Sequence, residues 1–174
     1  MIATALRPLA AVAFVGLIGS INGCLQTGQP SAPLQQGIAA ASAEGTGTVT
    51  SVIDGDTLRL EVDGVERRVR LVGIDTPEVY PNLECFGAEA DDALTALAPP
   101  GSTLRYAYDQ DPRDHYDREL MYLFTADGTF VNFQLVAQGY ATALVVQPND
   151  RYYDDFVAAE RAAQAAGLGQ WGQC

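Results

Sequence analysis

Two short acidic segments carry the side chains of this sequence that are best suited to bind a divalent cation. Asp54-Gly55-Asp56-Thr57 follows one predicted strand, and Asp75-Thr76-Pro77-Glu78 follows another, one hairpin further along the chain. Strand ends that are one hairpin apart can approach each other in space. Several hard oxygens gathered there would suit Ca²⁺, which takes about six to eight oxygen ligands. On spacing alone, two ordinary surface turns remain the alternative.

Two arginines add a second kind of chemistry to these acidic segments. Arg70 lies between apolar neighbours shortly before the second acidic segment, and Arg118 ends the segment Asp114-His115-Tyr116-Asp117-Arg118. Planar guanidinium groups bind phosphate oxygens through paired hydrogen bonds. Together with a metal ion, they would stabilise the charge that develops on a phosphoryl group. The alternative is ion pairing with local carboxylates, which we expect for Arg67 and Arg68.

The overall charge argues against a protein that binds nucleic acids through a nonspecific basic surface, which would require a basic patch and a high pI. The 174 residues include 22 Asp and Glu against 10 basic residues, all of them Arg, and the formal charge is −12. This excess of carboxylates without any Lys is typical of adaptation to molar salt, where the Debye length is about 3 Å. The alternative is an ordinary acidic protein that its own charge keeps monomeric. We interpret the chain as a halophilic protein and expect a monomer.

The N-terminal residues predict export. Residues 1–23 combine a short, positively charged start with an apolar stretch, as in a secretory signal peptide, and this stretch is shorter than a membrane span of about 20 residues. Ile21-Asn22-Gly23-Cys24 resembles a lipobox, so Cys24 is a candidate lipid anchor and the one expected contact with a membrane; an ordinary signal peptide cut nearby is the alternative. Residues 24–45 are rich in small and polar residues and predict a flexible tether. The folded domain is therefore expected over residues 46–174.

Hydrophobic periodicity predicts the elements that must position the acidic and arginine side chains. Strands are expected over residues 45–53, 57–62, 65–74, 102–108 and 120–124, with a hairpin turn at Asp63-Gly64. Helices are expected over residues 89–97, 131–138 and 152–166. This order predicts an α+β fold, a five-stranded OB-type barrel with about three helices.

The three cysteines are Cys24, Cys85 and Cys174. If Cys24 is lipidated, Cys85 and Cys174 remain as a pair that can form a disulfide in an oxidising compartment. Closing so long a loop stabilises the fold by roughly 4–5 kcal/mol in the chain-entropy description. Two free thiols are the alternative. Three scattered cysteines and a single histidine do not have zinc-site spacing.

Five segments in series resemble the staphylococcal-nuclease (thermonuclease) family. They are Ile53-Asp54-Gly55-Asp56-Thr57, Arg70-Leu71-Val72-Gly73-Ile74-Asp75-Thr76-Pro77-Glu78, Phe86-Gly87-Ala88-Glu89-Ala90, Asp114-His115-Tyr116-Asp117-Arg118, and Val131-Asn132 with Gln138-Gly139. The similarity runs in family order from about residue 46 to the C-terminus. It implies an OB-fold barrel with three helices and a Ca²⁺-dependent endonuclease acting on DNA and RNA, which cleaves the P–O5′ bond and leaves 3′-phosphate ends.

The resemblance also implies a role for each candidate residue of the acidic segments. Asp56 and Asp75 match the carboxylates that bind Ca²⁺ in the family, and Thr76 matches its backbone-carbonyl ligand. Glu78 matches the proposed general base, which acts on a water molecule near the metal. A carboxylate can orient and deprotonate water beside a cation, so the chemistry is consistent with this role.

The arginines match the two phosphate-binding residues of the family, and both are implied to be catalytic as well. The implied substrate-binding set is Arg70, Arg118, Asp114, His115 and Tyr116. Two tyrosines of the family's nucleotide pocket fall at Leu144 and Val146, and a basic residue of the phosphate loop falls at His115. Stacking on a base or sugar is therefore expected to be weaker there or supplied elsewhere.

Two other classes of protein compete with an exported nuclease. The first is a non-catalytic OB-fold module that binds nucleic acid or protein at the cell surface. The second is a Ca²⁺-binding structural domain, which would bind metal without turnover. A family member without catalytic activity would be expected to lack part of the catalytic set. Here all of its members are present: Asp56, Asp75, Glu78, Arg70 and Arg118. The sequence therefore favours an enzyme with a nucleic acid substrate, either secreted or lipid-anchored at the cell surface.

Overall fold

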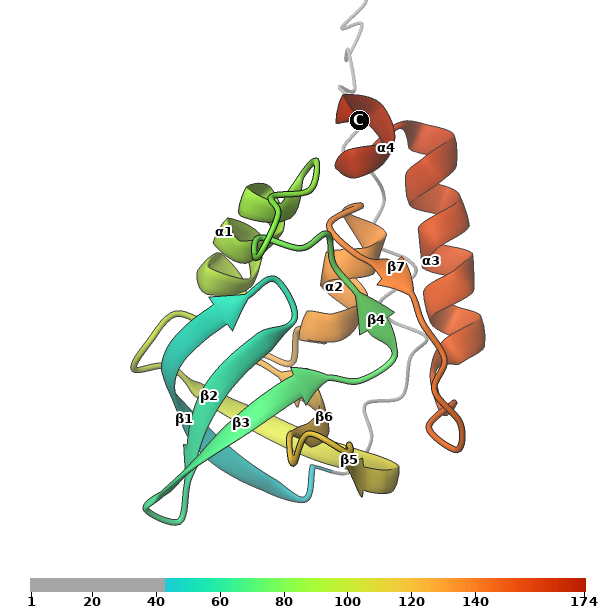
Figure 1. The fold of residues 1–174 in the computed structure, drawn as a ribbon. Coiled ribbons are helices and arrows are strands. Elements are labelled where there is room, and N and C mark those ends of the chain that lie inside the picture. Colours follow the sequence, from blue (N-terminus) through green and yellow to red (C-terminus); the bar gives the residue numbers. More distant parts are fainter. Residues whose placement is uncertain (1–42) are drawn as a thin grey trace, which may run out of the picture. The chain divides into compact units, whose positions relative to one another are not determined.

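A closed five-stranded barrel forms one end of residues 43–174, the part of the chain that the computed structural model describes (Figure 1). In order around the barrel, its strands are β1 (Gly45–Asp54), β2 (Thr57–Val62), β3 (Val65–Leu71), β6 (Glu119–Phe124) and β5 (Thr103–Arg113). β3 and β6 pair in parallel, and the other neighbours pair antiparallel. The predicted α+β barrel of five strands is confirmed.

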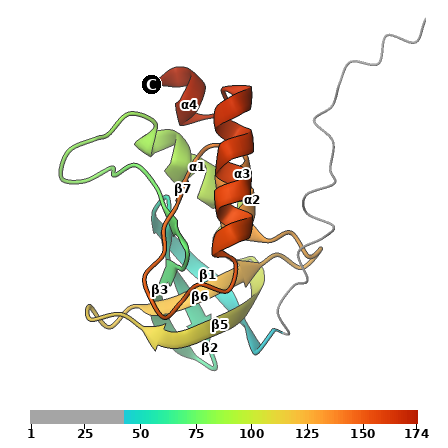
Figure 2. The ribbon, with the colours of Figure 1, turned by 90° about the vertical axis from the view of Figure 1, so that its right-hand side faces the viewer.

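The helices lie together at the other end of this unit, above the barrel in the view of Figure 1 and again in the view of Figure 2. They are α1 (Gly87–Leu97), α2 (Val131–Ala137), α3 (Tyr153–Ala166) and the single turn α4 (Gln170–Gln173). The three predicted helices are confirmed to within two residues at each end, whereas α4 was not predicted. No helix within residues 43–174 is long and apolar enough to cross a membrane.

Alternation along β2 and β3 decides which side chains face the barrel core. Leu58 and Leu60 of β2 and Val69 and Leu71 of β3 are fully buried. The residues that alternate with them on β3, at positions 66, 68 and 70, therefore lie on the outer face of the barrel. The hairpin that joins the two strands turns at Asp63-Gly64, where both φ angles are positive (52° and 75°), as a tight two-residue turn requires.

The predicted strand over residues 65–74 is wrong at its C-terminal end. Gly73 adopts a φ of 85°, in the left-handed region, and breaks the strand after Leu71. A Cβ at this position would lie 2.4 Å from the ring of Phe156, so the close packing of α3 also requires glycine there. The chain changes direction and continues as β4 (Ile74–Asp75), which pairs with β7 (Thr142–Ala143). This turn sends Asp75 and the following residues back toward the end of β1.

The strand predicted over residues 102–108 is longer than expected. β5 continues to Arg113, and Arg113 still pairs with Glu119 of β6 after a break in register. The added residues carry little intrinsic strand propensity. The buried side chain of Asn149 holds them instead, because it accepts a hydrogen bond from the N–H of Asp111 (2.8 Å) and donates one to its carbonyl (2.9 Å).

The hydrogen bonds of the Asn132 side chain explain why asparagine follows Val131 in this segment. It is fully buried in α2, and its Oδ1 accepts a hydrogen bond from the N–H of Leu123 at 3.0 Å. Its Nδ2 donates to the carbonyls of Val72 (2.9 Å) and Met121 (3.2 Å). One side chain thus satisfies three backbone groups where β3 ends beside β6, and it fixes the point at which the chain turns toward β4.

Cys85 and Cys174 form a disulfide, with their Cα atoms 6.0 Å apart. The bond joins the loop before α1 to the C-terminal residue that follows α4, and both segments lie at the upper end of the ribbon in Figure 1. The loop that it anchors also contains Glu78. The expected signal peptide over residues 1–23, the lipidation of Cys24 and the tether as far as residue 42 lie outside the described residues.

Removing this disulfide by the double substitution C85A/C174A is expected to lower the free energy of unfolding by about 2–5 kcal/mol. The reason is the long loop that it closes, because the two cysteines have a sequence separation of 89. Urea unfolding followed by the fluorescence of Trp171 measures the change, and the wild-type chain under reducing conditions provides the matched control. A loss below about 1 kcal/mol would show that the bridge contributes little to the stability of the fold.

Candidate active site

Asp56 is the most deeply buried acidic residue of the two segments and lies in the turn between β1 and β2. Its side chain is 10% exposed. Oδ1 accepts a hydrogen bond from the hydroxyl of Thr57 at 3.0 Å, and Oδ2 accepts from both the N–H and the hydroxyl of Thr76 at 3.2 Å. Burial raises the pKa of Asp56 to about 6, and the charge of Arg70 partly opposes this rise. The second acidic segment therefore packs directly against the first.

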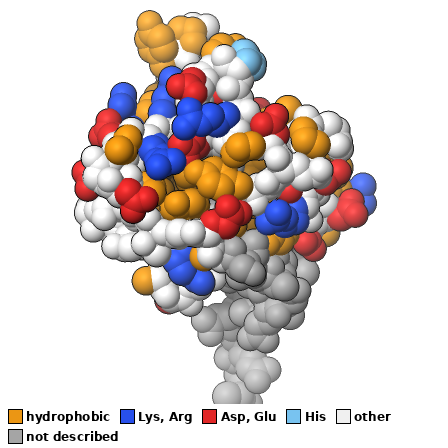
Figure 3. All heavy atoms as spheres, turned by 90° about the horizontal axis from the view of Figure 1, so that it is seen from below, with side chains coloured by type: hydrophobic (Ala, Val, Ile, Leu, Met, Phe, Trp, Pro, Cys, Tyr) orange, Lys and Arg blue, Asp and Glu red, His pale blue; other side chains and the backbone are white. Residues whose placement is uncertain are grey.

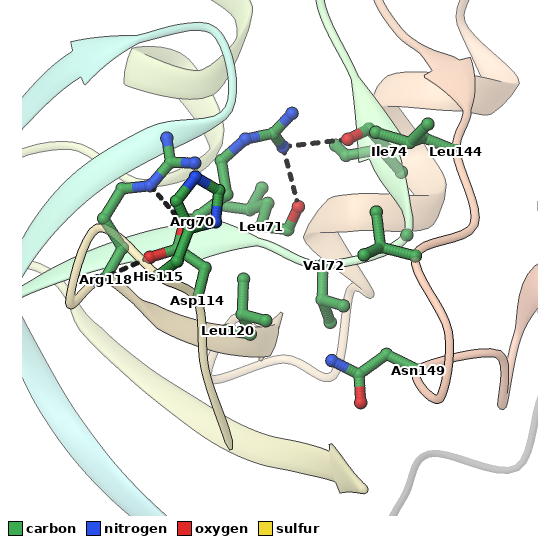
Figure 4. Close-up of a pocket in the computed structure, with 12 residues that line it drawn as sticks. Arg70, Leu71, Val72, Ile74, Asp114, His115, Arg118, Leu120, Leu144 and Asn149 are labelled. Carbon is green, nitrogen blue, oxygen red and sulfur yellow. Dashed lines mark hydrogen bonds and ion pairs between the residues drawn. The ribbon is translucent and has the colours of Figure 1, made fainter. Parts of the chain in front are cut away.

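Arg70 joins the two acidic segments through its guanidinium group. Its Nη2 lies 2.9 Å from Oδ2 of Asp56 and 2.8 Å from Oδ1 of Asp75. Its Nη1 donates hydrogen bonds to the carbonyls of Leu71 (2.9 Å) and Ile74 (2.8 Å), which are drawn in Figure 4. Two carboxylates thus converge on one cationic nitrogen, and the same side chain clamps the turn between β3 and β4.

The donor atoms around Asp56 fit a hard cation. Within residues 43–174, no group of three or more His, Cys, Asp or Glu side chains gathers in the manner of a metal cluster. The candidate ligands are two carboxylates, on Asp56 and Asp75, with the oxygens of Thr76 beside them. This set offers oxygen without nitrogen or sulfur, which is the preference of Ca²⁺ or Mg²⁺, and it leaves positions for water or a phosphate oxygen.

Glu78 lies in the loop that follows β4, on a hollow of about 360 Å³ that we call the acidic hollow. Its lining includes Asp54, Asp56, Glu78, Arg68, Arg70 and Arg118. The loop is held by two hydrogen bonds, because the N–H of Glu78 donates to the carboxylate of Glu84 and the N–H of Glu84 donates to the carbonyl of Glu78.

The carboxylate of Glu78 is placed to take up a proton. Partial burial raises its pKa, and the negative charges of Asp54, Asp75 and Glu84 add to this effect. Within residues 43–174 this carboxylate accepts no hydrogen bond and forms no ion pair. An unpartnered carboxylate with a raised pKa on the wall of a polar hollow has the properties of a general base.

Arg118 is fixed at one end of its guanidinium group and open at the other. Its Nε donates to Oδ2 of Asp114 at 2.7 Å, and its backbone N–H donates to Oδ1 of the same residue at 2.9 Å. The guanidinium carbon lies 5.5 Å from the centre of the Tyr116 ring. Both terminal Nη atoms have no partner within residues 43–174, so two donors of a planar fork are available to an anion.

A second hollow, of about 170 Å³, is also lined by Arg70 and Arg118, and we call it the apolar hollow. Figure 4 shows Asp114, His115 and Arg118 at one side of it, with Leu144 and Asn149 at the opposite side. Val72, Leu144 and Val146 give it an aliphatic wall. Arg70 and Arg118 line both hollows, so a ligand that is held between these two guanidinium groups can reach into either.

The structure brings together the residues that the sequence singled out and adds several that it did not. Asp54, Arg68 and Tyr80 also line the acidic hollow. Asp54 belongs to the first acidic segment, although it was not among the expected ligands. The expected ion pair of Arg67 is present, with Glu119 at 2.9 Å, whereas the one expected for Arg68 is wrong. The Arg68 side chain is exposed and has neither an ion pair nor a hydrogen bond within residues 43–174.

Comparison with known proteins identifies the family of this chain. The family described as staphylococcal nuclease homologue matches residues 68–173. A protein named thermonuclease from Staphylococcus intermedius is 39% identical over 126 residues, covering 71% of this chain and 74% of its own length. The thermonuclease of Staphylococcus hyicus is 33% identical over 144 residues, with 81% and 84% covered.

A longer relative contains the same domain. Endonuclease YhcR of Bacillus subtilis is 33% identical over 153 residues, which are 80% of this chain and 13% of that protein. The match to the family covers more than half of the present sequence, and the matched residues include Arg70, Glu78 and Arg118. The chain therefore belongs to the staphylococcal nuclease family.

Proposed function

We propose that this protein is a Ca²⁺-dependent nuclease that hydrolyses phosphodiester bonds of DNA and, we infer, of RNA. The observation that carries the proposal is the acidic hollow, where the buried Asp56, the unpartnered carboxylate of Glu78 and the open fork of Arg118 share one wall with Arg70. The related proteins named thermonuclease and endonuclease support the same activity.

The chain's own residues divide the reaction between proton transfer and charge stabilisation. Glu78 takes a proton from a water molecule as the water oxygen attacks phosphorus. The bond between phosphorus and O5′ breaks, and the leaving oxygen takes up a proton from solvent, which leaves a 3′-phosphate end. The terminal nitrogens of Arg118, together with Arg70, bind the phosphate oxygens on which negative charge develops.

Asp56, Asp75 and the carbonyl oxygen of Thr76 are the residues that would hold Ca²⁺. When bound, the ion supplies positive charge to the phosphate and to the water molecule beside it. The burial of Asp56 supports this assignment, because a carboxylate that desolvation makes costly to ionise gains more from a divalent cation than an exposed one.

The aliphatic wall of the apolar hollow supports a further part of the proposal, the binding of a nucleoside there. Leu144 and Val146 offer aliphatic surface to a sugar or base, where a stacked aromatic ring would bind it more strongly. We therefore infer that Asp114 and His115 at the opposite side contribute a larger share of substrate binding through polar contacts. The exposed Tyr116, which lines another hollow with Arg118, would add an aromatic surface.

We also infer that the protein acts outside the cytoplasm and at high salt, as a monomer. The disulfide supports an oxidising compartment, and the N-terminal sequence supports export, with Cys24 as lipid anchor. The formal charge of −12 without Lys supports operation in molar salt, where repulsion between the protein and a polyanion is screened.

Digestion of single-stranded and duplex DNA by the purified chain tests this function. Cleavage is expected with Ca²⁺ and not with a chelator, and activity is expected to persist at molar NaCl. Binding of DNA without cleavage, by a folded protein in Ca²⁺, would contradict the proposal and favour the non-catalytic OB-fold module. A monotonic fall in activity from low to molar NaCl would contradict the inference of salt adaptation alone.

A further inference from the structure

Arg68 is a cation that the proposed reaction does not yet use, and it lies next to the residues that the reaction does use. It is two residues before Arg70 on the outer face of β3, so the two side chains leave the barrel on the same side, about 7 Å apart along the strand. Arg68 lines the acidic hollow together with Arg70, Glu78 and Arg118.

The other arginines around Arg68 are neutralised, whereas Arg68 is not. Arg59 pairs with Glu66 at 2.8 Å, and both Arg67 and Arg113 pair with Glu119 at 2.9 Å. In the view of Figure 3, several arginine side chains lie near the chain's one histidine, and carboxylates lie between them. The chain has a formal charge of −12, so an unpaired arginine in the acidic hollow creates a local positive potential that favours binding of an anion.

Arg68 also shares a further hollow, of about 250 Å³, with Tyr116 and Arg118, and no carboxylate lines it. Tyr116 is 67% exposed, and the centre of its ring lies 3.8 Å from that of His115. An exposed aromatic ring beside an unpaired guanidinium group matches the two parts of a nucleotide, because the ring can stack on a base while the cation binds a phosphate.

We propose that Arg68 binds the phosphate next to the scissile one, in a subsite that it forms with Tyr116. The inference rests on the proposed nuclease function and names a specificity that this function does not require, a preference for polynucleotides over mononucleotide esters. The spacing of Arg68 and Arg70 on β3 is close to that of consecutive phosphates along an extended single strand. Arg68 is thus a substrate-binding residue that takes no part in bond cleavage.

The test compares R68Q with R161Q, because Arg161 on α3 is also exposed and has neither an ion pair nor a hydrogen bond within residues 43–174. Each variant is assayed on a short single-stranded DNA and on a nitrophenyl phosphodiester of thymidine, which has no neighbouring phosphate. For R68Q we expect KM on DNA to rise about fivefold to tenfold, with kcat within about twofold and the nitrophenyl ester cleaved as by the wild type. The slope of log kcat/KM against log NaCl on DNA should become shallower by about 0.7.

Equal losses on both substrates would overturn the proposal, because they would mean that Arg68 supports the chemistry or the fold. Equal effects of R68Q and R161Q on DNA would also overturn it, because they would mean that only net charge matters. If the wild type cleaves neither substrate, the nuclease proposal fails. Fluorescence anisotropy with labelled DNA then decides the inference by itself: weaker binding by R68Q than by R161Q supports it, and equal binding overturns it.

Discussion

Replacing Arg118 by alanine is expected to lower kcat on DNA by about 10²- to 10³-fold, the usual effect of removing one preorganised donor to a developing anion. The two terminal nitrogens of Arg118 have no partner within residues 43–174, so they are donors that the acidic hollow can offer to a phosphate. Initial rates of oligonucleotide cleavage in saturating Ca²⁺ measure the effect.

Two further variants separate the role of the guanidinium fork from that of charge. Arg118→Lys keeps the charge but loses the paired donors, and it should recover only a small part of the activity. Arg161→Ala removes a positive charge from the exposed face of α3, outside both hollows, and should leave kcat unchanged. If the lysine variant were fully active, binding in the hollow would depend on charge alone, and the assignment of a fork to Arg118 would be wrong.

Replacing Glu78 by glutamine is expected to lower kcat by about 10²- to 10⁴-fold, with little change in KM, because the amide cannot accept the proton of the attacking water. Glutamine preserves the size of the side chain, and the two hydrogen bonds that hold the loop use the backbone of Glu78, so the fold should be retained. Steady-state kinetics, with thermal unfolding as a check on folding, measures both expectations.

Glu61→Gln is the matched control for this change. Glu61 is an exposed carboxylate on β2 that does not line the acidic hollow, and its replacement should leave kcat unaltered. Retention of more than about a tenth of wild-type kcat by Glu78→Gln would contradict the assignment of Glu78 as the base. A large rise in KM with unchanged kcat would instead place Glu78 among the binding residues.

The local electrostatics of the site resolve the conflict between an acidic protein and a polyanionic substrate. Three carboxylates and three arginines line the acidic hollow: Asp54, Asp56, Glu78, Arg68, Arg70 and Arg118. The hollow is therefore neutral overall, although the chain carries a formal charge of −12. A cation at the carboxylates would make it positive, which couples metal binding to substrate binding without any basic surface elsewhere.

Much of the fold could be predicted because local signals and tertiary structure agree in the barrel. Alternation along β2 and the Asp63-Gly64 turn specify a hairpin without help from the rest of the chain. The break after Leu71 could not be predicted in this way, because it depends on the left-handed φ of Gly73 and on the ring of Phe156, which is distant in sequence. β4 and β7 have two residues each, too few for any periodic pattern.

The residues of the candidate site also differ in how far the sequence could predict them. The Asp56, Asp75 and Arg70 constellation follows from short segments whose spacing matches a family, and the structure places these side chains in contact. The state of Arg68 could not be read from the sequence, because several acidic residues lie within reach of it along the chain. Only the three-dimensional structure shows that Glu66 pairs with Arg59 and that Glu119 pairs with Arg67, which leaves Arg68 unpaired.

Cleavage of a defined single-stranded oligonucleotide by the wild-type chain in H₂¹⁸O, with Ca²⁺ present, tests the central claim most directly. Mass spectrometry of the products should find one ¹⁸O atom in a newly formed 3′-phosphate, because water is the nucleophile and the P–O5′ bond is the one that breaks. The same reaction in a chelator should give no product. A folded protein that leaves the oligonucleotide intact in Ca²⁺, or whose products carry no ¹⁸O, would contradict the account of this site as a metal-dependent phosphodiester hydrolase.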